Sequence, residues 1–175
     1  MFYQTTYSSP LGSISLVCDD AALVHLSLPG QVEFSGVAVE QYHPILKQAA
    51  DWLDRYFSGA APSPAELPLK PEGTAFQKVI WELLLTIPYG QTVTYGDLAK
   101  KAACILGKPR MSAQAVGQAV GANPISVIIP CHRVMGAKGK LTGYAGGLHY
   151  KIRLLELESP DFQERTSNFP VFVVS

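Results

Sequence analysis

The N-terminal third of the chain alternates between apolar and polar residues, which is the pattern of half-buried β-strands. Residues 2–7, 13–18 and 23–28 each show this alternation. Turn-forming residues separate the three runs, with Ser-Pro-Leu-Gly at 9–12 and two aspartates at 19–20. We therefore expect a small antiparallel sheet at the beginning of the chain.

A helical period follows the strands, after the residues 31–41, which show no clear period. Apolar residues recur three and four positions apart after His43-Pro44, until Ser58-Gly59 closes the run: Ile45, Ala49, Trp52, Leu53 and Tyr56. Four prolines then fall within residues 60–73, a density that forbids helix and disfavours a central strand. We expect an N-terminal subdomain over residues 1–59 and an extended linker after it.

Three helices separated by chain breaks are predicted in the second half. Thr74, Thr94 and Ser112 are suited to cap helix N-termini, and each precedes apolar residues at helical spacing. The second helix covers residues 95–103 and the third covers 113–120, with a glycine and a proline in the break between them. Two short helices joined in this way resemble a helix-turn-helix, although any two packed helices give a similar pattern.

These patterns predict an α+β fold. It has a small N-terminal antiparallel sheet with a helix, followed by a mainly helical C-terminal domain that contains the helix-turn-helix and Cys131. We place this second domain at residues 74–160 and a C-terminal tail at 161–175. Of the 175 residues, 47% are hydrophobic and 16% are charged, which excludes a disordered chain.

Composition also limits the cellular setting and the kind of site. Three cysteines cannot pair completely, so a disulfide framework is not expected, and no ligand-spaced set of Cys and His predicts a metal site. No apolar run approaches the roughly 18 residues that a membrane helix needs. The first residues lack the pattern of a signal peptide, and we expect a cytoplasmic protein without a membrane partner.

The zero net charge hides a basic segment. Residues 94–153 carry nine Lys and Arg against one acid, Asp97, while the segments on either side are acidic. This pattern is typical of a phosphate-binding face, and a solvated surface without a partner is the alternative. The third helix is composed mostly of Ala, Gly and Val, with Gln114 and Gln118 as its long side chains. If it binds DNA, close approach to the minor groove is favoured over base reading in the major groove, and tight helix packing is the other explanation.

One cysteine stands in a context that suits chemistry. The apolar run 126–129 is predicted to be a buried strand, and it leads into Pro130-Cys131-His132-Arg133-Val134. A thiol with a pKa of about 8.5 needs a base or a positive charge to become a thiolate. His132 and Arg133 supply both, although neighbours on an extended chain point to opposite faces, so that His132 would act through a water molecule. A buried inert thiol beside a surface His-Arg pair is the alternative.

The segment 130–134 resembles the active-site motif of the O6-alkylguanine-DNA alkyltransferase family. The similarity extends over about residues 74–158, through the helix-turn-helix, Gly-Ala-Asn-Pro at 121–124, Gly-Tyr-Ala-Gly-Gly at 143–147 and Lys-Ile-Arg-Leu-Leu-Glu at 151–156. The resemblance implies direct-reversal DNA repair in a single turnover. An alkyl group moves from O6 of guanine, with O4 of thymine left open, to the cysteine of a monomer that needs no cofactor and binds double-stranded DNA.

The resemblance also implies roles for individual residues. Cys131 is the acceptor, His132 its base, Glu158 the carboxylate that orients the imidazole, Asn123 a hinge residue and Tyr95 a proton donor to the leaving guanine. The base would be bound by Tyr144, the backbone N–H of Ala145 and the carbonyls of Cys131 and Val134. Gln114 stands where better-known relatives carry an intercalating arginine. The remaining residues expected at the DNA are Arg110, Ser112, Ala113, Ala115, Gly117 and Arg133.

Purely structural roles could also explain several of these residues. Tyr95 and Tyr144 could be core aromatic residues, and Glu158 could be solvated near a helix end. Two other functions also remain open from the sequence: a DNA-binding protein of the same fold that recognises alkylguanine without reacting, and a cysteine hydrolase that turns over. The presence of Cys131 argues against the first of these.

Overall fold

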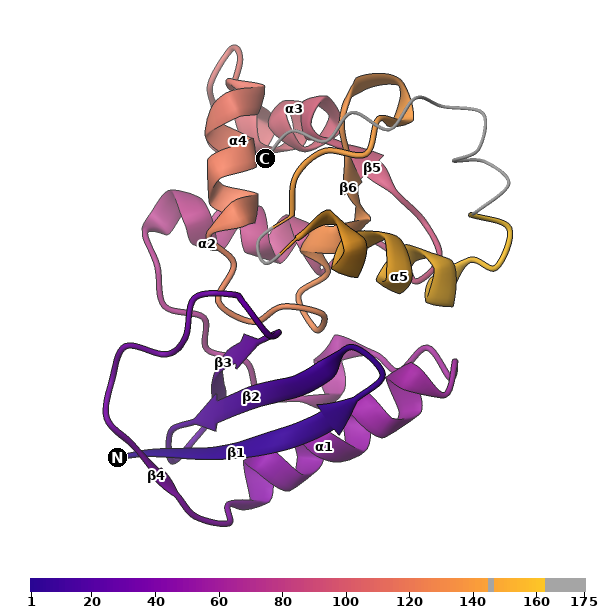
Figure 1. Cartoon of the computed structure of the whole chain (residues 1–175). Coiled ribbons are helices and arrows are strands. Elements are labelled where there is room, and N and C mark those ends of the chain that lie inside the picture. The colour runs from indigo at the N-terminus through magenta and orange to yellow at the C-terminus, as the bar shows by residue number, and fades with distance from the viewer. Residues whose placement is uncertain (145–146, 163–175) are drawn as a thin grey trace. The chain divides into compact units, whose positions relative to one another are not determined.

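The chain forms two units in the computed structural model, which describes residues 1–144 and 147–162 (Figure 1). The first unit comprises Met1–Glu72 together with Pro124–Ile128. The second unit comprises Gly73–Asn123 and the chain from Ile129 onward. The predictions for Ala145 and for the C-terminal tail beyond residue 162 lie outside the described residues.

Four strands form the sheet of the first unit. β1 (Phe2–Ser9), β2 (Gly12–Cys18) and β3 (Leu23–Ser27) pair antiparallel, and β4 (Ala38–Glu40) pairs parallel with β1 at the edge. The strand order is β3-β2-β1-β4. Gly12 opens β2 with a φ of 107°, in the left-handed region that glycine adopts without strain. The predicted antiparallel sheet is confirmed, and a short parallel strand extends it.

Helix α1 (Pro44–Phe57) supplies the apolar face that covers this sheet. His43 caps it, because its side chain accepts a hydrogen bond from the backbone N–H of Ile45. The buried residues are those predicted from helical spacing, together with Leu46. The Trp52 ring stacks on Tyr56, with 5.4 Å between the centroids, and its indole N–H donates to the carbonyl of Ser63.

The segment predicted to be an extended linker, residues 60–73, packs within the first unit almost to its end. It contains the short 3-10 helix η1 (Pro64–Glu66), and Leu67 is buried. The N–H of Leu23 donates to Pro68 at 2.8 Å, and the carbonyl of Leu23 accepts from Lys70 at 2.9 Å. The segment is therefore bound to β3 rather than free, because its prolines still leave carbonyls that can pair with an edge strand.

Helices dominate the second unit, as the sequence predicts. They are α2 (Ala75–Leu84), α3 (Tyr95–Ile105), α4 (Ala113–Gly121) and α5 (Leu148–Glu158). The expected caps are present: Thr74 and Thr94 form reciprocal capping boxes with Gln77 and Asp97, and Ser112 accepts from Ala115. The two-stranded sheet of β5 (Val93–Thr94) and β6 (Val134–Met135) and the 3-10 helices η2 (Cys131–Arg133) and η3 (Ala137–Gly139) complete the unit.

The helix-turn-helix consists of α3 and α4. Val116, Ala119 and Val120 form the buried side of α4, and the indole N–H of Trp81 donates to the carbonyl of Ala119 at 2.8 Å. The other side of the helix is exposed at Gln114. Tight packing thus explains part of the small-residue composition of α4.

The chain then passes through the first unit before it reaches the cysteine. Leu26 in β3 holds the passing segment by two backbone hydrogen bonds, from its N–H to Pro124 and from the N–H of Ser126 to its carbonyl. The strand predicted over residues 126–129 is wrong. Ser126 accepts from the N–H of Ile128 at 2.8 Å around Val127, whose φ is 70°, so the chain makes a γ-turn in its rarer, strained form. A buried turn and a buried strand are both apolar, which is why the hydrophobic run was misleading.

Candidate active site

Cys131 begins the short helix η2, directly after a second tight turn. Its backbone N–H donates to the carbonyl of Ile129 at 2.8 Å, around Pro130 with φ −82° and ψ 64°. Cys131 is 6% exposed and His132 is fully buried. The extended backbone expected at this point is therefore wrong, and the rule that neighbouring residues point to opposite faces does not apply to Cys131 and His132.

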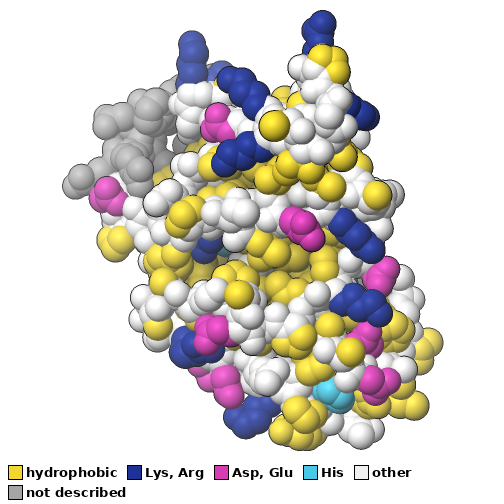
Figure 2. Space-filling model, turned by 180° about the vertical axis from the view of Figure 1, so that it is seen from behind, with side chains coloured by type: hydrophobic (Ala, Val, Ile, Leu, Met, Phe, Trp, Pro, Cys, Tyr) yellow, Lys and Arg dark blue, Asp and Glu magenta, His cyan; other side chains and the backbone are white. Residues whose placement is uncertain are grey.

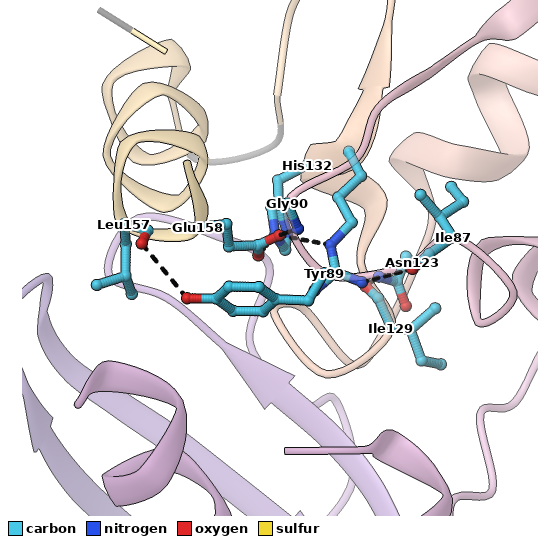
Figure 3. A network of polar contacts seen from close by, with 9 residues as sticks. Ile87, Tyr89, Gly90, Asn123, Ile129, His132, Leu157 and Glu158 are labelled. Carbon is cyan, nitrogen blue, oxygen red and sulfur yellow. Dashed lines mark hydrogen bonds and ion pairs between the residues drawn. The ribbon is translucent and has the colours of Figure 1, made fainter. Parts of the chain in front are cut away.

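The imidazole of His132 is held by Glu158, at the end of α5. His132 Nε2 lies 2.5 Å from Glu158 Oε2, and both side chains are buried (Figure 3). A carboxylate accepts a hydrogen bond, so this contact assigns the ring proton to Nε2 and leaves the lone pair on Nδ1. Nδ1 is buried and has no hydrogen-bond partner among the described residues. The prediction that Glu158 orients this imidazole therefore fits the geometry.

Arg133 completes a buried cluster around the same carboxylate. Its Nε donates to Glu158 Oε1 at 2.6 Å, and its Nη1 donates to the carbonyl of Ile87 at 2.7 Å. Glu158 also accepts from the backbone N–H of Gly90, and Tyr89 donates to the carbonyl of Leu157. The expectation that Arg133 contacts DNA is contradicted by this position, because the guanidinium is buried and bound within the protein.

Burial and the neighbouring charges set the protonation states of this pair. Burial would raise the pKa of Glu158, but the charge and hydrogen bond of His132 and those of Arg133 outweigh it and hold this pKa at about 2. Burial lowers the pKa of His132, against the opposing effect of Glu158, and Arg133 and Lys151 lower it further. The site thus consists of an ionised Glu158 and a neutral imidazole, which is able to accept a proton.

The thiol of Cys131 is protonated at rest for a similar reason. Burial raises its pKa, while hydrogen bonds with the side chains of Asn123 and Tyr144 and the charge of Lys151 act in the opposite direction. Asn123 also donates from Nδ2 to the carbonyl of Ile129 at 2.8 Å, which ties the end of α4 to the turn before the cysteine. Asn123, expected as a hinge residue, and Tyr144, expected to bind the base, therefore both lie beside the thiol.

Lys151 is a residue of this site that the sequence analysis did not single out. It is fully buried in α5, and its Nζ donates to the carbonyls of Val134 at 2.5 Å and Thr142 at 3.2 Å. Burial lowers its pKa to about 8. Val134, expected to accept from guanine, thus already accepts from a lysine. The signal in the sequence was a basic residue within the apolar face of a helix, next to Tyr150 and ahead of Leu154.

A cavity of about 420 Å³ lies at the helix-turn-helix. Its lining brings together Tyr95, Ala113, Gln114 and Gly117 from the sequence prediction, with Thr94, Gly96 and Ala137. Burial raises the pKa of Tyr95 in this lining, and the hydrogen bond from Thr142 acts in the opposite direction. Cys131 itself does not line the cavity.

The basic residues of the second half divide into two groups. Seven of the nine are exposed and two, Arg133 and Lys151, are buried in the site. The exposed ones are Lys100, Lys101, Lys108, Arg110, Lys138, Lys140 and Arg153. Figure 2 shows Lys and Arg side chains projecting from the end of the second unit. Of the residues expected at DNA, Arg110, Ser112 and Ala113 are exposed, while Ala115 and Gly117 are partly buried in α4.

Residues 1–144 and 147–162 form no helix that could span a membrane and no cluster that could hold a metal ion.

The fold and the site define a small α+β protein whose helix-turn-helix unit carries a buried Cys-His-Glu set. Two family models match this chain, and together they cover most of it. Residues 2–71 match the ribonuclease-like domain of 6-O-methylguanine DNA methyltransferase, and residues 75–160 match its DNA-binding domain. The chain belongs to the 6-O-methylguanine DNA methyltransferase family, which confirms the resemblance and the α+β fold class.

Individual relatives agree with this assignment. The methylated-DNA–protein-cysteine methyltransferase of Haemophilus influenzae is 39% identical, and the match covers 95% of this chain and 92% of that protein. The protein of the same name in Methanosarcina acetivorans is 44% identical, and the match covers 89% of this chain and 97% of that protein. The crystal structure of Mycobacterium tuberculosis OGT in complex with DNA has a TM-score of 0.80 at 39% identity, covering 90% of this chain and 93% of that one. An O6-methylguanine DNA methyltransferase from Methanococcus jannaschii has a TM-score of 0.64 at 31% identity, covering 88% and 92%.

Proposed function

We propose that this protein repairs DNA by transferring an alkyl group, typically methyl, from O6 of guanine to the sulfur of Cys131. The contact between His132 Nε2 and Glu158 Oε2 carries this proposal. This contact supports a His132 imidazole whose lone pair on Nδ1 is free. The residue before it in the chain is Cys131, whose thiol is buried. Family membership and the relatives' names support the same reaction.

The first step is removal of the thiol proton. His132 Nδ1 takes it, through a water molecule, and the imidazolium that forms is stabilised by the ionised Glu158. Hydrogen bonds from Asn123 and Tyr144 and the charge of Lys151 favour the thiolate over the thiol. The thiolate thus forms in a buried site.

The second step is an in-line displacement at the alkyl carbon. The thiolate of Cys131 forms the S–C bond, the C–O6 bond breaks, and its electron pair stays on the guanine. Tyr95 donates a proton to the leaving base, so that guanine leaves as a neutral molecule. The tyrosinate then regains a proton from the imidazolium of His132. The product is a thioether, which water does not cleave, so each protein molecule repairs one lesion.

DNA binding is assigned to the exposed side of α4 and to the exposed lysines and arginines of the second unit. The small residues of α4 permit close approach to the minor groove, and basic side chains contact phosphates. The damaged base must leave the stack to reach the thiol, and Gln114 at the cavity fills the space it leaves. We further propose that the protein acts as a monomer in the cytoplasm, without a cofactor.

Intact mass measurement after incubation with a duplex containing O6-methylguanine tests the proposal. We expect a gain equal to one methyl group in place of one hydrogen, limited to one equivalent and located on Cys131. Cys131→Ser should show no gain, and Cys104→Ser, which removes an exposed cysteine, should behave as the wild type. Repeated turnover would indicate a hydrolase, and binding without any gain would indicate a non-catalytic recognition protein.

A further inference from the structure

The residues between the hinge and the active-site cysteine belong to the first unit. The chain leaves the second unit after Asn123, runs through residues 124–128 in the first unit, and returns at Ile129, two residues before Cys131. The two ends of this excursion are tied together, because Asn123 Nδ2 donates to the carbonyl of Ile129. A short stretch of backbone therefore links the thiol of Cys131 to the groups of the first unit that hold residues 124–128.

A side chain of the first unit holds the middle of the excursion. Gln31 Oε1 accepts a hydrogen bond from Ser126 Oγ at 2.8 Å, across 95 positions of sequence. The same oxygen accepts from the backbone N–H of Leu28 at 2.9 Å, just after the end of β3. Ser126 is 3% exposed, so its hydroxyl depends on this partner rather than on water.

The backbone at this point needs such a restraint. Val127 is 1% exposed and has a φ of 70°, a conformation that β-branched residues rarely adopt. Strained backbone of this kind persists only where the surrounding structure fixes it, and it occurs preferentially near functional sites. The backbone of Leu26 holds Pro124 and Ser126 by two hydrogen bonds, and the side chain of Gln31 holds the hydroxyl of Ser126.

We infer that Gln31 is a positioning residue for the transfer reaction, acting through Ser126 and the 124–131 backbone on the sulfur of Cys131. The inference rests on the proposed function. In-line displacement needs sulfur, carbon and O6 to be aligned, and small displacements of a reacting atom lower the rate much more than they lower binding. The first unit therefore contributes to the chemical step without touching substrate.

Substitutions at Gln31 separate this role from simple stability. The hydrogen bonds from Leu28 and Ser126 both use the side-chain oxygen of Gln31 as acceptor, so Gln31→Glu keeps these two bonds and Gln31→Leu removes them. Ser126→Ala removes the hydroxyl contact alone and preserves the buried volume. Gln4→Leu is the matched control, because it removes a hydrogen bond in the same sheet, from Gln4 to Glu40, that does not involve residues 124–128.

The experiment measures the first-order rate of methyl transfer at saturating O6-methylguanine duplex, the Kd for the unmodified duplex and the Tm of each full-length variant. We expect Gln31→Leu and Ser126→Ala to transfer about tenfold more slowly with an unchanged Kd. Gln31→Glu and Gln4→Leu should transfer at the wild-type rate.

Two results would have different meanings. Wild-type rates in Gln31→Leu and Ser126→Ala, with or without a lower Tm, would overturn the positioning role and leave the proposed function intact. A wild-type protein that takes no methyl group would overturn the proposed function and the positioning role with it. If Gln31→Leu does not fold, the rate of Ser126→Ala decides alone.

Discussion

Arg133 and Glu158 lie 25 positions apart and form a buried ion pair, with Arg133 Nε 2.6 Å from Glu158 Oε1. The same carboxylate holds His132 on its other oxygen. Glu158 therefore serves a structural and a chemical purpose at once, because it neutralises a buried guanidinium and orients the proposed base. Removing it leaves a buried positive charge without its carboxylate, which is among the more costly changes that a protein core can undergo.

Glu158→Gln is predicted to change the pH dependence of stability. The folded pKa of about 2 lies below the unfolded value, so the stabilisation by Glu158 is present above about pH 4.3 and is lost as the pH falls toward 2. Its size is about 3 kcal/mol. Urea unfolding between pH 2 and 6 should show a shallower pH dependence in Glu158→Gln than in the wild type. The exposed Glu82→Gln serves as control, and an equal dependence in all three proteins would contradict the prediction.

Lys151→Met is predicted to change stability in the alkaline range. The folded pKa of about 8 lies below the ordinary value of lysine, so the folded state binds fewer protons and stability rises as the pH increases from about 8 to 10.4. Lys151→Met should lack this rise, which amounts to about 3 kcal/mol in the difference between the two proteins. Urea unfolding at pH 7, 8, 9 and 10 measures it. A constant difference across this range would mean that Lys151 titrates as an exposed lysine does.

Gln114→Arg is predicted to strengthen DNA binding. Gln114 is exposed and lines the cavity, where a guanidinium can reach a phosphate or the space left by the extruded base. We expect a lower Kd and a slope of log Kd against log salt that is steeper by about one. Gln118→Arg adds the same charge to an exposed position of α4 outside the cavity lining. If both variants behave alike, the effect belongs to overall charge and Gln114 has no special position.

Gly117→Leu is predicted to block the cavity. A Cβ at Gly117 would lie 3.8 Å from the Tyr95 ring, an ordinary contact distance, so Gly117→Ala fits while the longer leucine must enter the cavity. We expect wild-type transfer for Gly117→Ala and a reduction of about tenfold or more for Gly117→Leu. Both residues favour helix over glycine, so a lower helix propensity cannot explain a loss. Single-turnover rates with Tm values as control decide between blocking and unfolding.

The helices could be predicted from the sequence because their signals are local. Thr74 and Thr94 cap helices through partners three residues away, Gln77 and Asp97, and these contacts are present. The same holds for the apolar face of α1, whose period is visible in a single stretch of chain. Such features depend on residues that are close in sequence, so a sequence pattern can predict them.

The site could be predicted only in part because its contacts are long-range. The family resemblance assigns Cys131, His132 and Glu158, and the structure brings the last two together. The burial of Arg133, by contrast, depends on Ile87 and Glu158, both distant in sequence, and its charge suggested a surface position instead. The turn at Val127 was missed for the same reason, since an apolar run does not reveal which partners fix its backbone.

The excursion of residues 124–128 through the first unit also determines where this protein can be divided. A truncated chain that begins at Gly73 would retain Ile125, Val127 and Ile128, each at most 1% exposed in the intact protein, without the β3 backbone that receives them. We expect such a fragment to aggregate rather than to fold as an autonomous module. A shortened version of this protein therefore needs to keep both units.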